Sequence, residues 1–250
     1  MVEAAGPYHR RVMVESRPAD RIVAVVPAHD EGPRIEAVVR GAARHLPVIV
    51  VDDGSSDDTA ERAVAAGATV VRQVPNRGKG AALRAGFRRA LDDGADAVVT
   101  LDADGQHDPA EIPRFLATFE QTRPDLVIGR RDFRRMPPVR RLSNELGGLA
   151  FSWAVGRPIA DNQSGYRLIA RPLVERLLGS TETGFAFEVE MLTLAIRAGH
   201  EIAWVPIRTI YAGEPSHVRP VAHLREFVRI VRRARRDVRE PLPDLGEPVP

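Results

Sequence analysis

The chain has 250 residues, of which 44% are hydrophobic and 28% charged, and its formal net charge is +2. These values fit one large globular α/β domain. The absence of cysteine excludes disulfides and thiolate metal sites, and no run approaches the roughly 18 apolar residues of a membrane span. Residues 1–19 carry charges that break any apolar run, so we expect a disordered tail there and no signal peptide. The lack of cysteine predicts a cytoplasmic protein.

From residue 20 onward, short apolar runs alternate with segments of helical periodicity. Ser56 is the expected N-cap of the second helix, and Gly67 is its expected end. This alternation, with short connections, predicts a Rossmann-like, mostly parallel sheet with helices on both faces, in one domain over residues 20–222. The predicted strands are 21–26, 48–51, 68–72, 97–101 and 126–128, and the predicted helices are 35–42, 56–67, 81–91 and 109–120.

Two later segments are strongly basic. Residues 130–141 contain six arginines and one acid, so they form either solvated surface or an anion-binding lid. Residues 223–240 form a predicted basic amphipathic helix with seven arginines, followed by a tail at 241–250. The apolar stripe of that helix either binds an anionic membrane surface or packs on the protein's own core. Because both arginine clusters are local, nucleic-acid binding is the weaker interpretation. The elements expected around these segments are helices at 142–155 and 184–198 and a strand at 201–207.

Two carboxylates follow the predicted strand at 97–101. If strand geometry persists, Asp102 and Asp104 lean to one side, with Gln106 two residues further on. Carboxylates held this close repel each other and are best stabilised by a divalent cation with hard oxygen ligands, Mg²⁺ or Mn²⁺. Such ions usually share their site with substrate phosphate, so a phosphorylated ligand is predicted. The alternative is that both residues are turn and cap residues.

Other polar loops follow neighbouring predicted strands, at 29–32 and 52–58, and therefore share the edge of the sheet at which α/β proteins bind ligands. This coincidence favours the functional interpretation of Asp102 and Asp104. The turn at 76–80 matches neither a P-loop nor a dinucleotide fingerprint, and its Lys79 is either a phosphate contact near a helix N-terminus or a solvated residue. The polar cluster from Asp161 to Arg167 is either a further site loop or an Asx-type turn.

The order and spacing of these motifs resemble the family 2 glycosyltransferases of GT-A fold, especially the dolichyl-phosphate mannosyltransferases and polyprenyl-phosphate glycosyltransferases. The resemblance covers about residues 21–218. The matching segments are Val-Val-Pro-Ala-His-Asp-Glu at 25–31, Val-Val-Asp-Asp-Gly-Ser-Ser-Asp at 50–57, Asn-Arg-Gly-Lys-Gly at 76–80, Leu-Asp-Ala-Asp-Gly-Gln at 101–106, Gly-Arg-Arg at 129–131, Ser-Gly-Tyr-Arg at 164–167 and Val-Pro-Ile at 205–207.

The resemblance implies a site residue by residue. Arg130 would hold an anionic group of donor or acceptor, and Ser216-His217 stands where eukaryotic members carry Ser-Lys at the substrate. His29 replaces the tyrosine that is common in the family. The residues implied at the base and ribose of a sugar nucleotide are Pro27, Ala28, His29, Glu31 and Asp53, and those implied at the diphosphate and metal are Asp102, Ala103, Asp104 and Gln106.

The implied reaction is inverting transfer of a hexose from GDP-mannose or UDP-glucose to a polyprenyl or dolichyl phosphate, with Mg²⁺ or Mn²⁺. The candidate catalytic residues are Asp104, Asp161 and Arg130. Asp161 would be the base for a hydroxyl acceptor, and would only orient the acceptor or basic side chains for a phosphate acceptor. The expected location is cytoplasmic, peripheral at the inner face of the membrane. The alternatives are a non-lipid hydroxyl acceptor and a nucleotidyltransferase, which would release pyrophosphate.

Overall fold

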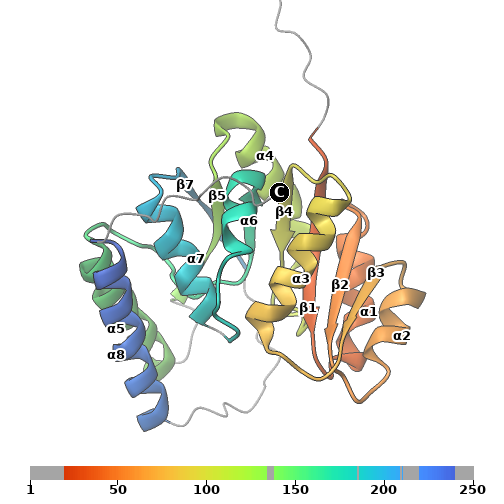
Figure 1. Ribbon diagram of the computed structural model, residues 1–250, viewed down its shortest axis with the longest axis horizontal. Helices are drawn as coiled ribbons and strands as arrows, with labels where there is room; N and C mark the ends of the chain where they lie inside the picture. Colours follow the sequence, from red (N-terminus) through yellow and green to blue (C-terminus); the bar gives the residue numbers. More distant parts are fainter. Residues whose placement is uncertain (1–19, 134–137, 185, 209, 211–219, 240–250) are drawn as a thin grey trace, which may run out of the picture.

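Seven strands form one mixed sheet in the computed structural model, which describes residues 20–133, 138–184, 186–208, 210 and 220–239 (Figure 1). The strand order is β3-β2-β1-β4-β6-β5-β7. The expected tails at 1–19 and 241–250, and Ser216 and His217, lie outside the described residues. The strands are β1 (Ile22–Ala28), β2 (Val48–Asp53), β3 (Thr69–Gln73), β4 (Ala97–Thr100), β5 (Leu126–Arg131), β6 (Arg167–Ala170) and β7 (Ile202–Ile207).

The central strand β1 shows why the apolar runs become strands of a covered sheet. Val23 and Val25 belong to the core on one face, and Ala24 and Val26 to the core on the other. Successive side chains of a strand point to opposite faces, so a continuous apolar run buries both. The prediction of a mostly parallel sheet with helices on both faces is confirmed.

The exception to parallel order is β6, which runs antiparallel to both β4 and β5. The sequence analysis predicted no strand there. Its first residue, Arg167, pairs with the last residue of β4, Thr100. The Thr100 hydroxyl also donates a 2.7 Å hydrogen bond to the Gly165 carbonyl oxygen. The reversed strand therefore brings the loop before β6 directly to the carboxyl end of β4.

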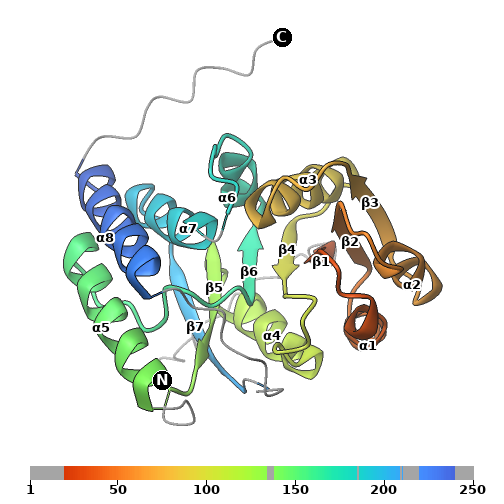
Figure 2. The same ribbon diagram turned by 90° about the horizontal axis from the view of Figure 1, so that it is seen from below.

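Helices cover both faces of the sheet (Figure 2). Residues of α1, α2 and α4 pack into the core on one face, and residues of α3, α6 and α7 into the core on the other, with α5 and α8 beyond them. The helices are α1 (Gly32–Ala42), α2 (Thr59–Ala65), α3 (Lys79–Asp92), the short 3₁₀ helix η1 (Pro109–Glu111), α4 (Ile112–Thr122), α5 (Pro138–Val155), α6 (Arg171–Leu177), α7 (Ala186–Arg197) and α8 (Pro220–Asp237).

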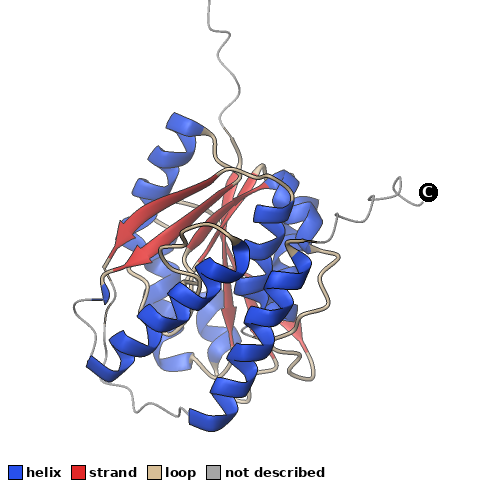
Figure 3. Ribbon diagram, turned by 90° about the vertical axis from the view of Figure 1, so that its left-hand side faces the viewer, coloured by secondary structure: helices blue, strands red, loops and turns tan. Residues whose placement is uncertain are grey.

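Among the apolar residues of α8 whose side chains are described, Val228 is exposed and the others turn inward. Val231 and Ala234 are buried, and Ile230 and Val238 pack against the core that also contains Phe151 of α5. Figure 3 looks onto the end of the molecule where α5 and α8 lie. Of the two interpretations of this helix, packing on the protein's own core is the one found. No helix in the described ranges is long and apolar enough to cross a bilayer.

Three expected boundaries need correction. Strand β4 ends at Thr100, so Asp102 and Asp104 are not placed by strand alternation. Ser56 does not cap α2, which begins at Thr59, because Ser56 instead donates hydrogen bonds to Asp30. Helix α6 follows β6 without having been expected. Gly67 stands just after α2 with φ 98°, as a glycine that ends a helix does.

Candidate active site

The polar loops after β1, β2 and β4 lie at one edge of the sheet, as predicted. Ala28 is level with Asp52 in the parallel register of β1 and β2, and Val25 is level with Thr100 in that of β1 and β4. Because the three strands are parallel, their carboxyl ends meet at this edge. The reversed strand β6 adds the loop 161–166 to it.

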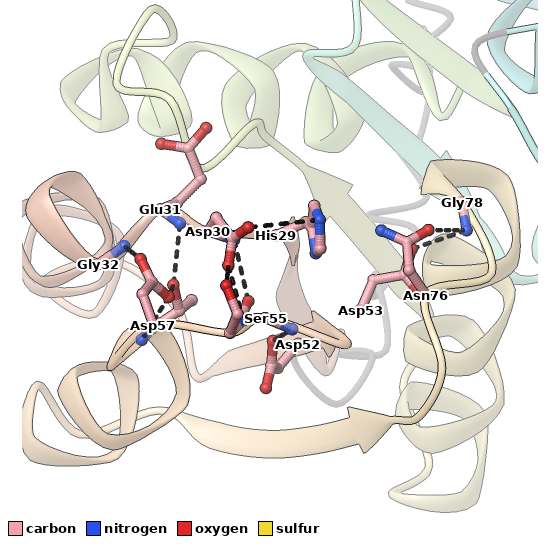
Figure 4. A network of polar contacts seen from close by, with 12 residues as sticks. His29, Asp30, Glu31, Gly32, Asp52, Asp53, Ser55, Asp57, Asn76 and Gly78 are labelled. Carbon is pink, nitrogen blue, oxygen red and sulfur yellow. Dashed lines mark hydrogen bonds and ion pairs between the residues drawn. The ribbon is translucent and has the colours of Figure 1, made fainter.

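The loops after β1 and β2 are tied to each other by backbone and side-chain hydrogen bonds (Figure 4). The Asp30 backbone is left-handed, with φ 53°, and its carboxylate accepts hydrogen bonds from Ser56 N (2.7 Å) and Oγ (3.1 Å). The other links are Asp30 N to Ser55 Oγ (3.0 Å), Glu31 N to Thr59 Oγ1 (2.9 Å) and Gly32 N to Asp57 Oδ2 (3.0 Å). These bonds fix the start of α1 against the second loop.

Asp53 builds the turn that precedes α3. Its two carboxylate oxygens accept hydrogen bonds from Arg77 N (2.8 Å) and Gly78 N (2.7 Å), and its side chain is buried. Gly78 has φ 89°, and a Cβ there would lie 2.5 Å from the Thr183 carbonyl oxygen. Asp53 and Gly78 therefore fix the position from which the next residue, Lys79, enters the site.

Lys79 is not a solvated turn residue, because two carboxylates engage it. Its Nζ lies 2.6 Å from Asp102 Oδ1 and 2.8 Å from Glu188 Oε1, and it is largely buried. Burial alone would lower the pKa of this ammonium group, but the two carboxylates raise it above its ordinary value. Lys79 therefore stays charged and joins α3 to the loop after β4 and to α7.

The same polar cluster continues to Arg167, which is fully buried at the start of β6. Its Nε donates to the Ser164 carbonyl oxygen (2.8 Å) and its Nη1 to the Glu188 carbonyl oxygen (2.7 Å). Burial lowers the pKa of Arg167 to about 10. Three buried polar atoms in this cluster have no hydrogen-bond partner, namely Ser164 Oγ, Arg167 Nη2 and Glu188 Oε2.

The segment from Asp102 to His107 turns sharply after β4. Asp102 N donates to His107 Nδ1 (3.1 Å), and burial lowers the pKa of His107 to about 4, so this ring is neutral near pH 7. Burial would raise the pKa of Asp102, but the charge of Lys79 lowers it to about 2. Asp104 Oδ1 accepts from Gln106 N (2.9 Å). The turn thus holds two carboxylates apart. The negative charge of Asp102 is compensated by Lys79, and Asp104 is the second carboxylate.

The surroundings of Asp104 fit a divalent cation. Partial burial raises the pKa of Asp104, and the nearby negative charges of Asp102 and Glu31 raise it further. Asp104 and Gln106 offer the hard oxygen atoms that Mg²⁺ and Mn²⁺ prefer, and these ions usually need only one or two carboxylates beside phosphate oxygens. Within the described residues no group of three or more His, Asp or Glu side chains is arranged to hold a metal by itself. The donor set therefore fits a cation that arrives with a phosphorylated ligand.

Asp161 and Arg131 form a bidentate ion pair at the end of β5. Arg131 Nε lies 2.7 Å from Asp161 Oδ2, and Nη2 lies 2.9 Å from Oδ1. The buried Asp161 carboxylate also accepts from Gln163 N and Ser164 N. Of the two roles considered for Asp161, these contacts favour the one that orients a basic side chain. Arg130, the arginine expected to bind an anion, is exposed on the neighbouring position of the strand.

The remaining predicted residues lie in different surroundings. Pro27 is half-buried at the end of β1, and the side chain of His29 is exposed beside Asp30, 3.6 Å between His29 Nε2 and Asp30 Oδ2. Glu31 forms an ion pair with Arg34 (2.8 Å). Ala28 and Ala103 are buried in the core under the loops. Any direct ligand contact of these two residues would therefore come through their backbone.

Three residues of the site were missed by sequence reasoning, namely Glu188, Arg131 and His107. Glu188 is not among the predicted site residues. A signal was available, because Glu188 precedes Met191 and Leu192 by three and four residues and so shares their buried helical face. An acid on such a face needs a partner. Nothing in the local pattern distinguishes Arg131 from Arg130.

The sequence pattern of the family described as "Glycosyl transferase family 2" matches residues 23–178, which contain most of these loops. The chain belongs to this family. It is therefore a glycosyltransferase, and the expected family and GT-A fold are confirmed. The match includes β1 to β6 and the Asp102–Gln106 segment, but ends before Glu188.

Relatives and solved structures agree with this assignment. The chain is 32% identical to the undecaprenyl-phosphate mannosyltransferase of Micrococcus luteus, over 75% of this chain and 82% of that one. It is 29% identical to the UDP-N-acetylglucosamine–dolichyl-phosphate N-acetylglucosaminyltransferase of Methanococcus voltae, over 77% and 87%. Glucosyl-3-phosphoglycerate synthase from Mycobacterium tuberculosis, solved with Mn²⁺, UDP-glucose and phosphoglyceric acid, has a TM-score of 0.67 and 26% identity, over 91% of this chain and 82% of that one.

Proposed function

We propose that this glycosyltransferase moves a hexose from a nucleotide-diphosphate sugar, GDP-mannose or UDP-glucose, to a polyprenyl or dolichyl phosphate, with inversion and with Mg²⁺ or Mn²⁺. The observation that carries the proposal is the uncompensated carboxylate of Asp104 beside the buried Lys79–Asp102 pair, at the carboxyl edge of the sheet. Relatives named for polyprenyl-phosphate acceptors support the acceptor class.

The chain's own residues have distinct proposed roles. Asp104 and Gln106, with Asp102 beside them, would hold the cation, which when bound neutralises the charge of the leaving diphosphate. Arg130 binds an anionic group of donor or acceptor from its exposed position at the end of β5. The other proposed donor contacts, at base, ribose and diphosphate, are Pro27, Ala28, His29, Glu31, Asp53, Lys79, Ala103 and Arg167, with Ser216 and His217 at the substrate.

The contacts of Asp161 favour a phosphate acceptor over a hydroxyl. A phosphate is already anionic near neutral pH, whereas a hydroxyl acceptor needs a base in position to take its proton. Asp161 is the carboxylate proposed for that role, and it is engaged by Arg131 and by two backbone amides. It orients the arginine in this reaction. A lipid acceptor places the reaction at the inner face of the membrane.

The test is a donor and acceptor screen. Labelled GDP-mannose, UDP-glucose or UDP-N-acetylglucosamine is incubated with the protein, Mg²⁺ or Mn²⁺, and undecaprenyl phosphate, and label is extracted into organic solvent. Lipid-soluble label with release of nucleoside diphosphate supports the proposal. Transfer only to 3-phosphoglycerate, the kind of acceptor that the solved neighbour's ligand suggests, would show a soluble acceptor instead. Release of pyrophosphate would show a nucleotidyltransferase.

A further inference from the structure

Three large apolar side chains of α5 are exposed on one face of the helix. Leu146, Leu149 and Trp153 are 57%, 68% and 65% exposed. Their spacing of three and four residues places them side by side, while Phe151 and Val155 of the same helix are buried in the core. Single exposed apolar residues are ordinary in soluble proteins, but a row of them on one face marks an interaction surface.

Helix α8 adds positive charge directly beside this row. The Arg235 guanidinium lies over the Trp153 ring, 3.6 Å from its centroid. Val228 and Arg232 lie on the same face of α8 as Arg235, at helical spacing, and both are exposed, as is Arg239 two residues after the end of the helix. We call the combined surface the docking face; its members are Leu146, Leu149 and Trp153 of α5, Val228, Arg232 and Arg235 of α8, and Arg239 just after α8.

The docking face extends along α5 and α8 toward their C-terminal ends. In Figure 1, α5 and α8 lie side by side at one end of the molecule, and both begin at the edge where β4 and β5 end. The contact of Trp153 with Arg235 joins the C-terminal parts of the two helices, in agreement with this common direction. A planar partner on the docking face would therefore lie alongside both helices, whose first turns are at the site edge.

The charges nearby indicate what kind of partner fits. The acids closest in sequence are already paired, Glu145 with Arg141 (2.6 Å) and Asp237 with Arg233 (3.4 Å). The face therefore presents arginines and apolar groups together. A second copy of the chain would bring arginines against arginines, which repel. An anionic bilayer offers negative headgroups to arginine and an interfacial layer that favours tryptophan and leucine.

We propose that the docking face binds the anionic leaflet of a membrane, with the α5 residues in the interfacial layer and the α8 arginines at the lipid headgroups. The inference rests on the proposed function for its purpose, since a lipid-phosphate acceptor lies in the membrane that this surface would bind. It differs from the expectation drawn from the sequence, because the apolar contact comes mainly from α5, whereas of the described apolar side chains of α8 Val228 is exposed and the others face inward.

Co-sedimentation with vesicles tests the proposal without any acceptor. The vesicles contain phosphatidylcholine with or without phosphatidylglycerol, and no polyprenyl phosphate. Wild-type full-length protein should bind the anionic vesicles, bind neutral ones at least tenfold less, and lose affinity as salt rises. The double variants Leu149→Gln/Trp153→Gln and Arg232→Glu/Arg239→Glu should each lower the affinity at least tenfold. A failed acceptor screen with intact vesicle binding would reject the proposed function alone.

Matched controls separate the docking face from general surface properties. Val64 on α2 is 60% exposed, so Val64→Gln controls for loss of an exposed apolar side chain, and Arg44→Glu/Arg88→Glu controls for net charge at exposed positions away from the docking face. Thermal unfolding checks that every variant is folded. The proposal would be overturned if the wild-type protein does not bind anionic vesicles, or if the control variants lose as much affinity as the docking-face variants. A concentration-dependent dimer in light scattering, abolished by Leu149→Gln/Trp153→Gln, would assign the face to self-association instead.

Discussion

Glu188 of α7 lies 2.8 Å from the ammonium nitrogen of Lys79, the first residue of α3. Asp102 contacts the same nitrogen from the loop after β4, so one buried cation joins three elements that are far apart in the sequence. Removing one partner of a buried ion pair leaves an uncompensated charge and costs about 3 to 5 kcal/mol.

Glu188→Ala should therefore lower the free energy of unfolding by about 3 kcal/mol or more. Glu190→Ala is the matched control, because Glu190 lies on the same helix but is only partly buried, and its contacts with Arg233 and Ser180 should contribute less than a fully buried ion pair. Urea unfolding measures both values. Equal effects of the two substitutions would mean that the Lys79–Glu188 contact contributes little.

Gly165 allows the Lys79–Asp102 pair to close. A Cβ at this position would lie 3.0 and 3.1 Å from the two Asp102 carboxylate oxygens and 3.2 Å from Lys79 Nζ. Gly165→Ala should destabilise the protein by about 1 to 3 kcal/mol through overpacking and should lower activity. Gly148→Ala, in open space within α5, should instead stabilise by about 0.5 to 1 kcal/mol. Thermal unfolding of both variants decides, and a stable, fully active Gly165→Ala would contradict the assignment.

Arg130 and Arg131 should respond differently to the same truncation. Arg131→Ala removes the bidentate partner of buried Asp161, so it should lower stability as well as turnover. Arg130 is exposed, so Arg130→Ala should leave the unfolding midpoint unchanged and raise KM for donor or acceptor, because arginine binds phosphate bidentately. Kinetics and urea unfolding are measured on both. An unchanged KM in Arg130→Ala would make this residue solvated surface.

Activity should require Mg²⁺ or Mn²⁺ and should depend on Asp104. Asp104→Asn keeps the side-chain size but removes the charge that the cation needs, so turnover should fall by orders of magnitude while the protein stays folded. Asp93→Asn, in a surface ion pair with Arg89, is the control and should retain activity. Activity with and without EDTA, and on restoring each metal, completes the test. Full turnover in excess chelator would show that no cation is needed.

The sequence by itself determined the alternation of strands and helices, the edge of the sheet that carries the site, and the family. These follow from local patterns, because a buried strand must be apolar and a loop at its carboxyl end can be polar. The motif from Asp102 to Gln106 could be found in the same way, since its members are close in the chain.

Only the tertiary structure decided how the charges pair. Strand β6 runs antiparallel and brings Gly165 to Asp102, and α7 brings Glu188 to Lys79, although no local pattern links these segments. Lys79 is thereby a buried cation between two carboxylates, and Asp161 is the ion-pair partner of Arg131. The inward stripe of α8 and the exposed row on α5 were decided in the same way, because an amphipathic pattern does not say what covers its apolar face.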